Sequence, residues 1–203
     1  MLRTVHTLAV VTLLGGFFPP ASARADEPWK VYANKDGVSY ARRAVSGSRF
    51  YEYRAEVLVP APPARVLDAI WRGITETIPK TVKKRTVLSR SDSEFLVYDQ
   101  LDPPVVKDRD VTIQIRKRAL ASGGVEVAFV SVSALGPPPN RDYVRIPAVR
   151  GAWTLEPAAG GTQLTYHCYS EPGGSVPAFL VRGVQQDQVA EDVERILSRL
   201  RGH

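Results

Sequence analysis

The last third of the chain constrains the fold more than any other segment. An apolar-alternating stretch ends at residues 151–157, turns through 159–161 and returns over 162–169, a pattern that predicts a β-hairpin. A long amphipathic helix follows, and we expect it to begin near Ser175 as N-cap, with Pro177 in its first turn. A hairpin that leads into one long C-terminal helix predicts a curved sheet that grips the helix and encloses an apolar pocket.

The two halves of this helix differ in their apolar pattern. In the rear half, apolar residues recur at three- and four-residue steps and predict one buried face: Val189, Val193, Ile196 and Leu200. The front half, residues 176–184, is apolar around nearly its whole circumference. Such a turn either lies deep in the core or covers a ligand cavity as a lid, and the sequence leaves both interpretations open.

The rest of the chain predicts an α+β fold. One helix is expected over residues 64–77, since apolar side chains recur at helical spacing between Pro62-Pro63 and Pro79. Strand patterns bounded by turn signals cover these ranges: 38–42, 49–59, 80–90, 94–101, 108–118 and 125–135. With 203 residues, the chain has the length of a single domain.

The N-terminus has the pattern of a secretory signal peptide. A short basic start precedes an apolar run over residues 7–18, and small residues around Ala25 offer a cleavage site. The run falls short of the roughly 20 apolar residues that span a bilayer. We therefore expect residues 1–25 to be removed and residues 26–203 to form one domain in the periplasm or outside the cell.

The cysteine and histidine content excludes several classes of site. Cys168 is the only cysteine, so an internal disulfide cannot form. His6 lies in the expected leader and His203 ends the chain, which leaves His167 alone within the fold. One His and one Cys cannot complete a four-ligand zinc site, and we expect no metal and no other cofactor. Neighbours on one strand point to opposite faces, which excludes a Cys168–His167 nucleophile pair.

Several motifs, in their order along the chain, carry a resemblance to a known family. They are residues 97–99, the proline-containing loop 103–106, Asp108-Arg109-Asp110-Val111, Tyr143-Val144-Arg145 and the Gly- and Pro-marked segment 172–177. Over residues 29–200 the chain resembles the START family, the lipid-transfer domains related to steroidogenic acute regulatory protein. The resemblance implies a helix-grip fold, in which a curved antiparallel sheet wraps around the C-terminal helix and a hydrophobic tunnel between them binds one lipid or sterol. The leader suits an exported, bacterial-type member.

Strand alternation and the apolar front of the helix supply candidates for the lining of such a tunnel. The apolar and aromatic candidates are Tyr98, Val111, Ile113, Phe129, Trp153, Tyr166, Phe179, Leu180 and Val184. Ser131 and Ser133 share a face with Phe129 and are either tunnel hydroxyls or strand groups bound to water. Arg145 either binds a lipid head group or forms a salt bridge with Asp142 or another surface acid. The acids around Arg109 favour an ion-pair network that fixes the start of a strand.

These patterns favour a lipid-binding protein that carries a lipid or sterol-like molecule between membranes and is not an enzyme. The first alternative is a small non-metal enzyme of the same superfamily, cyclase- or aromatase-like, with His167 and Arg145 as candidate groups for a hydrophobic substrate. The second is an interaction module whose interior is filled by its own aromatic side chains: Phe129, Trp153, Tyr166 and Phe179.

The charge pattern bears on the partners. Loss of Arg3 and Arg24 with the leader lowers the formal net charge from +6 to +4, which suits transient contact with an anionic membrane surface. The basic run 80–85 contains no aromatic residue on which a base could stack, and a charged edge strand explains it equally well. We expect no nucleic-acid partner and a monomeric protein.

Overall fold

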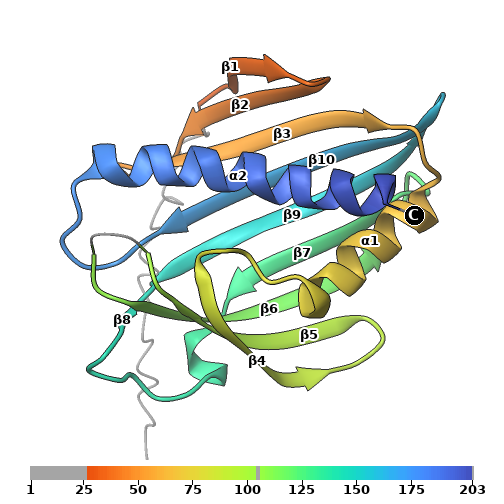
Figure 1. Cartoon of the computed structure of the whole chain (residues 1–203). Coiled ribbons are helices and arrows are strands. Elements are labelled where there is room, and N and C mark those ends of the chain that lie inside the picture. Colours follow the sequence, from red (N-terminus) through yellow and green to blue (C-terminus); the bar gives the residue numbers. More distant parts are fainter. Residues whose placement is uncertain (1–26, 104–105, 203) are drawn as a thin grey trace, which may run out of the picture.

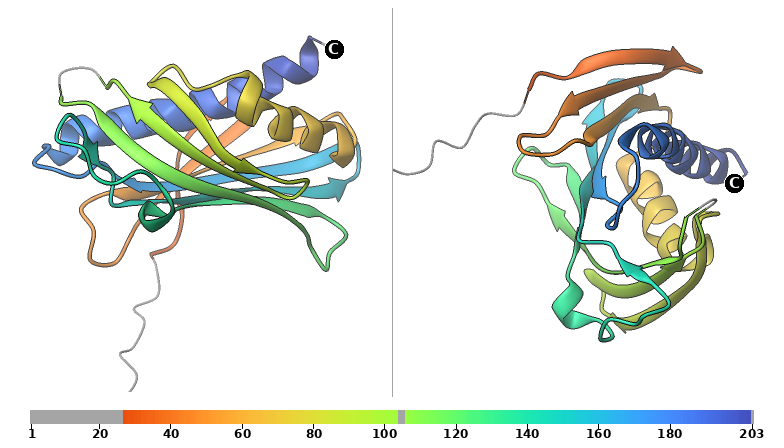
Figure 2. Two further views of the ribbon diagram at one scale, coloured as in Figure 1. Left: turned by 90° about the horizontal axis from the view of Figure 1, so that it is seen from below. Right: turned by 90° about the vertical axis from the view of Figure 1, so that its left-hand side faces the viewer.

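A ten-stranded sheet curves around a long C-terminal helix (Figures 1 and 2). The structure is a computed structural model that describes residues 27–103 and 106–202, so the expected signal peptide lies outside the described residues. The strands are β1 (Lys30–Lys35), β2 (Val38–Ala44), β3 (Tyr51–Val59), β4 (Val82–Arg90), β5 (Glu94–Leu101), β6 (Arg109–Ala119), β7 (Val125–Ser131), β8 (Val144–Arg145), β9 (Ala148–Ala158) and β10 (Gly161–Glu171). The helices are α1 (Pro63–Glu76) and α2 (Ala178–Arg201), with a 3-10 turn at Ser133–Leu135.

The sheet order is β1-β2-β3-β10-β9-β7-β6-β5-β4, and the short β8 pairs with β6. All neighbours in that order are antiparallel, whereas β8 runs parallel to β6. The predicted hairpin is confirmed as β9 and β10, in which Trp153 faces Tyr166 and Leu155 faces Leu164. The α+β helix-grip fold expected from the sequence is therefore the fold of this chain.

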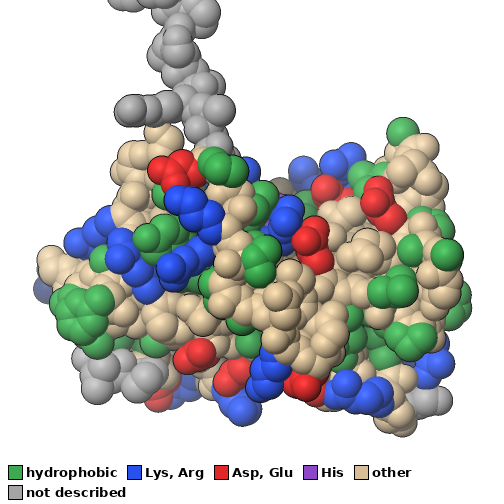
Figure 3. Space-filling view, turned by 90° about the horizontal axis from the view of Figure 1, so that it is seen from above, with side chains coloured by type: hydrophobic (Ala, Val, Ile, Leu, Met, Phe, Trp, Pro, Cys, Tyr) green, Lys and Arg blue, Asp and Glu red, His purple; other side chains and the backbone are tan. Residues whose placement is uncertain are grey.

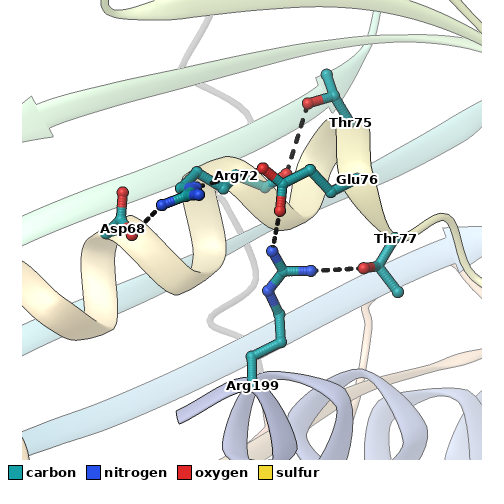
Figure 4. A network of polar contacts seen from close by, with 6 residues as sticks. All are labelled: Asp68, Arg72, Thr75, Glu76, Thr77 and Arg199. Atoms are coloured by element: carbon teal, nitrogen blue, oxygen red, sulfur yellow. Dashed lines mark hydrogen bonds and ion pairs between the residues drawn. The ribbon is translucent and has the colours of Figure 1, made fainter. Parts of the chain in front are cut away.

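The rear half of α2 is fixed to the sheet and to α1. Val189, Val193 and Ile196 are buried against the inner face of the sheet, which confirms the predicted rear stripe. Arg199 reaches from α2 to Glu76 and Thr77 at the end of α1, and Arg72 joins the same network (Figure 4). These contacts close one end of the space between the helix and the sheet.

Helix α2 begins two residues later than the sequence suggested. The helix starts at Ala178, with Pro177 rather than Ser175 in the N-cap position and no side-chain cap. A proline disfavours helical dihedrals in the residue before it, so Val176 is unsuited to the first helical turn and a helix capped by Ser175 does not form. Gly173 and Gly174, with φ of +70° and +64°, turn the chain into this segment.

The strand expected over residues 125–135 also ends early, at Ser131. The chain leaves the sheet at Val132 and forms the 3-10 turn that contains Ser133. The prolines that follow at residues 137–139 lack the N–H groups that a strand ladder needs. Among the described residues, neither helix has the length and apolar character that crossing a membrane requires.

Candidate ligand-binding cavity

A cavity of about 420 Å³ lies between the inner face of the sheet and α2. This volume falls in the range of roughly 300–1,000 Å³ typical of ligand pockets. Its sheet side is formed mainly by apolar and aromatic side chains: Val111, Ile113, Ile115, Val127, Phe129, Val149, Trp153 and Tyr166. Its helix side is formed by Leu180, Val181, Val184, Gln185, Gln188, Val189 and Asp192. Aromatic side chains therefore line the hollow without filling it.

The aromatic floor depends on close packing between neighbouring strands. The rings of Trp153 and Tyr166 stack with centroids 3.9 Å apart and planes 13° apart. Phe129 adjoins Tyr166, with 6.2 Å between centroids. A Cβ at Gly151 would lie 2.5 Å from the Phe129 ring and 2.1 Å from the His167 carbonyl oxygen, so only glycine allows this arrangement.

Polar groups on the helix side form a hydrogen-bonded cluster around Asp192. The Asp192 carboxylate accepts three hydrogen bonds: from the Tyr166 hydroxyl at 2.9 Å, from the Gln188 amide at 3.1 Å and from the Arg195 guanidinium at 2.7 Å. Burial raises the pKa of Tyr166 well above its ordinary value, and the Asp192 carboxylate adds to the rise. Tyr166 therefore remains a neutral hydrogen-bond donor, and the charges of Asp192 and Arg195 balance.

A second ion pair lines the cavity beside α1. Arg85 binds the buried Asp99 through two nitrogens, at 2.7 and 2.6 Å, and donates to the Ile74 carbonyl oxygen at 2.7 Å. Arg85 ends the basic run that the sequence suggested as a charged edge strand. Lys83 and Lys84 are exposed on that edge strand, but Arg85 turns inward.

The structure brings seven of the twelve predicted tunnel residues together around the cavity, namely Val111, Ile113, Phe129, Trp153, Tyr166, Leu180 and Val184. The other five, Tyr98, Ser131, Ser133, Arg145 and Phe179, do not line it. The apolar front of α2 lies partly in the core and partly over the cavity, so both interpretations of its sequence pattern apply. Val176 and Val181 are buried in a small second core with Phe50 and Tyr169 and also border the cavity. Leu180 and Val184 border the cavity as well and are partly exposed.

Arg145 and Tyr98 lie on the opposite side of the sheet, around Asp110. Arg145 forms a two-point ion pair with Asp110 at 2.7 and 2.8 Å, and the Tyr98 hydroxyl donates to the same carboxylate at 2.8 Å. The ion-pair interpretation of Arg145 therefore holds, with the buried Asp110 in place of Asp142. Burial alone would raise the pKa of Asp110, but the hydrogen bonds from Arg145 and Tyr98 lower it below its ordinary value.

The remaining predicted positions serve other contacts or face solvent. The Ser131 hydroxyl accepts a hydrogen bond from the Val149 N–H at 3.0 Å. Ser133 is exposed in the 3-10 turn, because the strand ends before it. Phe179 is 73% exposed on the first turn of α2 and points away from the cavity lining.

Most of the polar lining was not predicted from the sequence, and two of these residues have incomplete polar contacts. Arg109 is 4% exposed and lines the cavity at the start of β6. Counting two residues back from the inward-facing Val111 would have found it. Gln185 also lines the cavity, and its buried Oε1 has no hydrogen-bond partner. The sequence offers no signal for Gln185, because the front of the helix is apolar around nearly its whole circumference and so does not indicate which side faces inward.

His167 and Cys168 lie on opposite faces of β10, as strand geometry predicts. His167 Nδ1 is 3.1 Å from a Glu52 carboxylate oxygen on the outer face, whereas Cys168 lines the cavity. Cys168 is accessible only in part, because it faces the hollow deep in the protein, and burial raises the pKa of its thiol to about 12. Within the described part of the chain, no group of three or more His, Cys, Asp or Glu side chains could hold a metal ion.

Comparisons with known proteins agree with this geometry. The START domain family model matches residues 22–203. An uncharacterized protein of Pseudomonas aeruginosa is 28% identical over 184 residues, which covers 89% of this chain and 90% of the relative. The crystal structure of a STAR-related lipid transfer protein from Xanthomonas axonopodis is 26% identical, with a TM-score of 0.75, and the match covers 86% of this chain and 99% of that one. Human StAR-related lipid transfer protein 5, at 17% identity and a TM-score of 0.70, shares the fold over 84% of this chain and 85% of its own.

Proposed function

Because this chain belongs to the START domain family, we propose that it binds one lipid or sterol-like molecule in the cavity beneath α2. The observation that carries the proposal is the apolar hollow of about 420 Å³. At about 0.8 kcal/mol per buried CH₂ group, a long acyl chain in such a hollow gains on the order of 10 kcal/mol before the costs of ordering. The seven predicted residues around the cavity would then contact the hydrocarbon chain of the bound lipid.

We propose binding rather than catalysis because both candidate groups of the enzymatic alternative are engaged outside the cavity. His167 contacts Glu52, and Arg145 is paired with Asp110. The proton of the Cys168 thiol, with its pKa of about 12, is retained at neutral pH, so the cavity cysteine is a poor nucleophile.

Native mass spectrometry of the purified protein tests this proposal. The expected result is a mass adduct of one lipid per chain, which organic extraction removes. The extracted protein then rebinds fluorescent fatty-acid, phospholipid or sterol analogues with one-to-one stoichiometry. A protein without adduct that binds none of these analogues would contradict the proposal.

We also propose that the front of α2 touches a membrane during uptake and release, so that the protein shuttles its ligand between membranes. Phe179, Leu180 and Val184 are 73%, 44% and 48% exposed. At the end of the molecule where α2 begins, hydrophobic side chains lie beside a group of Lys and Arg (Figure 3). Apolar side chains next to basic ones are the combination that binds anionic bilayer surfaces.

Vesicle sedimentation with the variant Phe179→Ser tests the membrane contact. Removal of an inserted aromatic side chain should weaken association with anionic vesicles roughly 10-fold. Leu135→Ser is the matched control, because Leu135 is 55% exposed on the 3-10 turn instead. Equal vesicle binding by both variants would argue against contact through α2.

We further propose that the protein is exported to the periplasm or out of the cell. It rests on the leader pattern of residues 1–25. The mature protein should begin at Asp26 and migrate as a monomer in size-exclusion chromatography. N-terminal sequencing that finds Met1 on the protein outside the cytoplasm would contradict cleavage.

A further inference from the structure

Arg109 is a buried cation on the cavity wall that has no carboxylate partner. It is 4% exposed and lines the cavity. Its guanidinium donates to the carbonyl oxygens of Lys107 and, at 3.5 Å, of Pro172. Among residues 27–103 and 106–202, no ion pair involves Arg109, so only neutral carbonyl groups compensate its charge.

Most of the other charged groups around Arg109 already have ion-pair partners. Of the arginines that line the cavity, Arg85 is paired with Asp99 at 2.6 Å and Arg195 with Asp192 at 2.7 Å. The acids on either side of Arg109 in the sequence are also occupied: Asp108 lies 3.7 Å from Lys83, and Asp110 is paired with Arg145. Glu171 also lines the cavity and has no ion-pair partner among the described residues, but its carboxylate accepts a hydrogen bond from the Tyr169 hydroxyl and none from Arg109.

A buried charge without a counter-ion is costly, and the electrostatics of this position favour an anion. Burial lowers the pKa of Arg109, yet a guanidinium remains protonated at neutral pH. Its planar fork of N–H donors matches the two oxygens of a carboxylate or the oxygens of a phosphate. Among the described residues, Arg109 is therefore the arginine of the cavity lining that no carboxylate pairs with.

The position of Arg109 within β6 relates the charge to the apolar surface. Side chains of Arg109, Val111, Ile113 and Ile115 follow at two-residue steps and all line the cavity. At about 3.3 Å per residue, this row extends roughly 20 Å from the guanidinium, far enough for a long acyl chain. A cation thus stands at one end of an apolar row.

We propose that Arg109 binds the anionic group, a carboxylate or a phosphate, of an amphipathic lipid whose chain lies along this row. The proposal rests on the proposed lipid-binding function and names the chemical class of the ligand. Neutral sterols and alcohols fill the same cavity but leave Arg109 without its counter-ion.

Titration of the delipidated full chain with three ligands of equal chain length tests the proposal. The ligands are hexadecanoic acid, hexadecyl phosphate and hexadecanol, each followed by displacement of a fluorescent probe. A charge-assisted hydrogen bond to Arg109 should make at least one anionic ligand bind roughly 10- to 100-fold more tightly than the alcohol. The tighter of the two anions identifies the head group as carboxylate or phosphate.

The variant Arg109→Met tests whether Arg109 causes the preference for anionic ligands, because methionine keeps an apolar side chain of similar length and removes the charge. It should lose the preference for the anion while binding hexadecanol as tightly as the natural chain does. Arg118→Met removes an arginine whose side chain is 63% exposed at the far end of β6 and should keep the preference.

The outcomes separate this inference from the proposed function. Natural protein that binds all three ligands equally overturns the role of Arg109 and leaves lipid binding intact, even if the variant fails to fold. Arg109→Met that keeps the full preference, or loses the alcohol together with the anion, also overturns it. Natural protein that binds none of the three contradicts the proposed function itself.

Discussion

The two faces of strand β6 satisfy their polar side chains in different ways. On the outer face, Asp110 accepts hydrogen bonds from Arg145 and Tyr98, all within 2.8 Å. Further along the same face, Gln114 and Arg116 both bind Glu94. On the inner face, Arg109 meets only carbonyl oxygens and the side chains beyond it border a hollow.

This difference between the two faces of β6 distinguishes side chains that stabilise the fold from side chains that are available to a ligand. A buried charge that has its partners within the chain fixes the strand and needs nothing else. A buried charge that lacks a partner and lies beside a cavity can bind a ligand of opposite charge, and the apolar cavity wall next to it can bind the ligand's hydrocarbon part. The outer face of β6 therefore stabilises the fold, whereas the inner face is where we expect a ligand to bind.

The largest expected difference between the faces is in stability. Asp110→Asn leaves the mostly buried Arg145 without a counter-ion and should lower the free energy of unfolding by about 3 kcal/mol. Arg109→Met, one residue away, removes an unpaired charge and should leave the free energy of unfolding unchanged or raise it by about 1 kcal/mol. Urea denaturation of the ligand-free proteins measures both. If both variants lose the same stability, the two faces do not differ as described.

Acid should remove the contribution of the outer face specifically. The pKa of Asp110 is lower in the folded than in the unfolded protein, where it is about 3.9. Its contribution is therefore complete above about pH 4 and is lost as the pH falls through the folded value. Urea denaturation from about pH 6 down to about pH 2 should show a shallower loss for Asp110→Asn than for the natural chain. Glu52, whose pKa is also lowered, supplies acid sensitivity common to both proteins. Parallel curves would contradict the assignment to Asp110.

A smaller effect is expected at Thr112, also on the outer face. Thr112 is fully buried, and its Oγ1 has no hydrogen-bond partner in the described part of the chain. The close approach of Gly136 leaves no room for another donor, since a Cβ there would lie 1.7 Å from Oγ1. Thr112→Val removes the unsatisfied hydroxyl and should raise the free energy of unfolding by about 1 kcal/mol. A loss of stability would mean that the hydroxyl has a partner in solution.

The smallest stability effect is expected on the inner face, at Ile113. Ile113→Phe adds volume beside the cavity, where space is available, so the free energy of unfolding should change by less than about 1 kcal/mol. The same change should weaken binding of a long acyl chain roughly 10-fold, because it narrows the hollow. Fluorescent lipid titration alongside urea denaturation checks both parts. A large destabilisation would indicate that the interior is already filled.

Much of the fold could be predicted because its signals are local. Two-residue alternation gave the bounds of β5, Glu94–Leu101, and three- and four-residue steps gave the buried rear of α2. The short β8 and the polar edge strand β1 carry no such pattern, since one pairs over two residues and the other is mostly exposed. The late start of α2 depends on the restriction that Pro177 places on Val176, which competes with the capping preference of Ser175.

The site could be predicted only as far as its apolar side chains. The inward position of Val111, Ile113 and Trp153 follows from alternation along their own strands. Whether a polar residue faces the cavity depends on partners far away in sequence. Arg145 turns outward because Asp110, 35 residues away, binds it there. The acids on either side of Arg109 predict an ion-pair network around it, yet Asp108 and Asp110 pair with Lys83 and Arg145 instead.

Photo-crosslinking with a fatty acid that carries a diazirine along its chain tests the central claim most directly. The full-length protein is irradiated with the probe bound, and the labelled peptides are identified by mass spectrometry. The account predicts labels on inner-face residues such as Val111, Ile113 and Phe129. Labels confined to outward-facing residues such as Leu58 and Val130, 49% and 45% exposed, would contradict it.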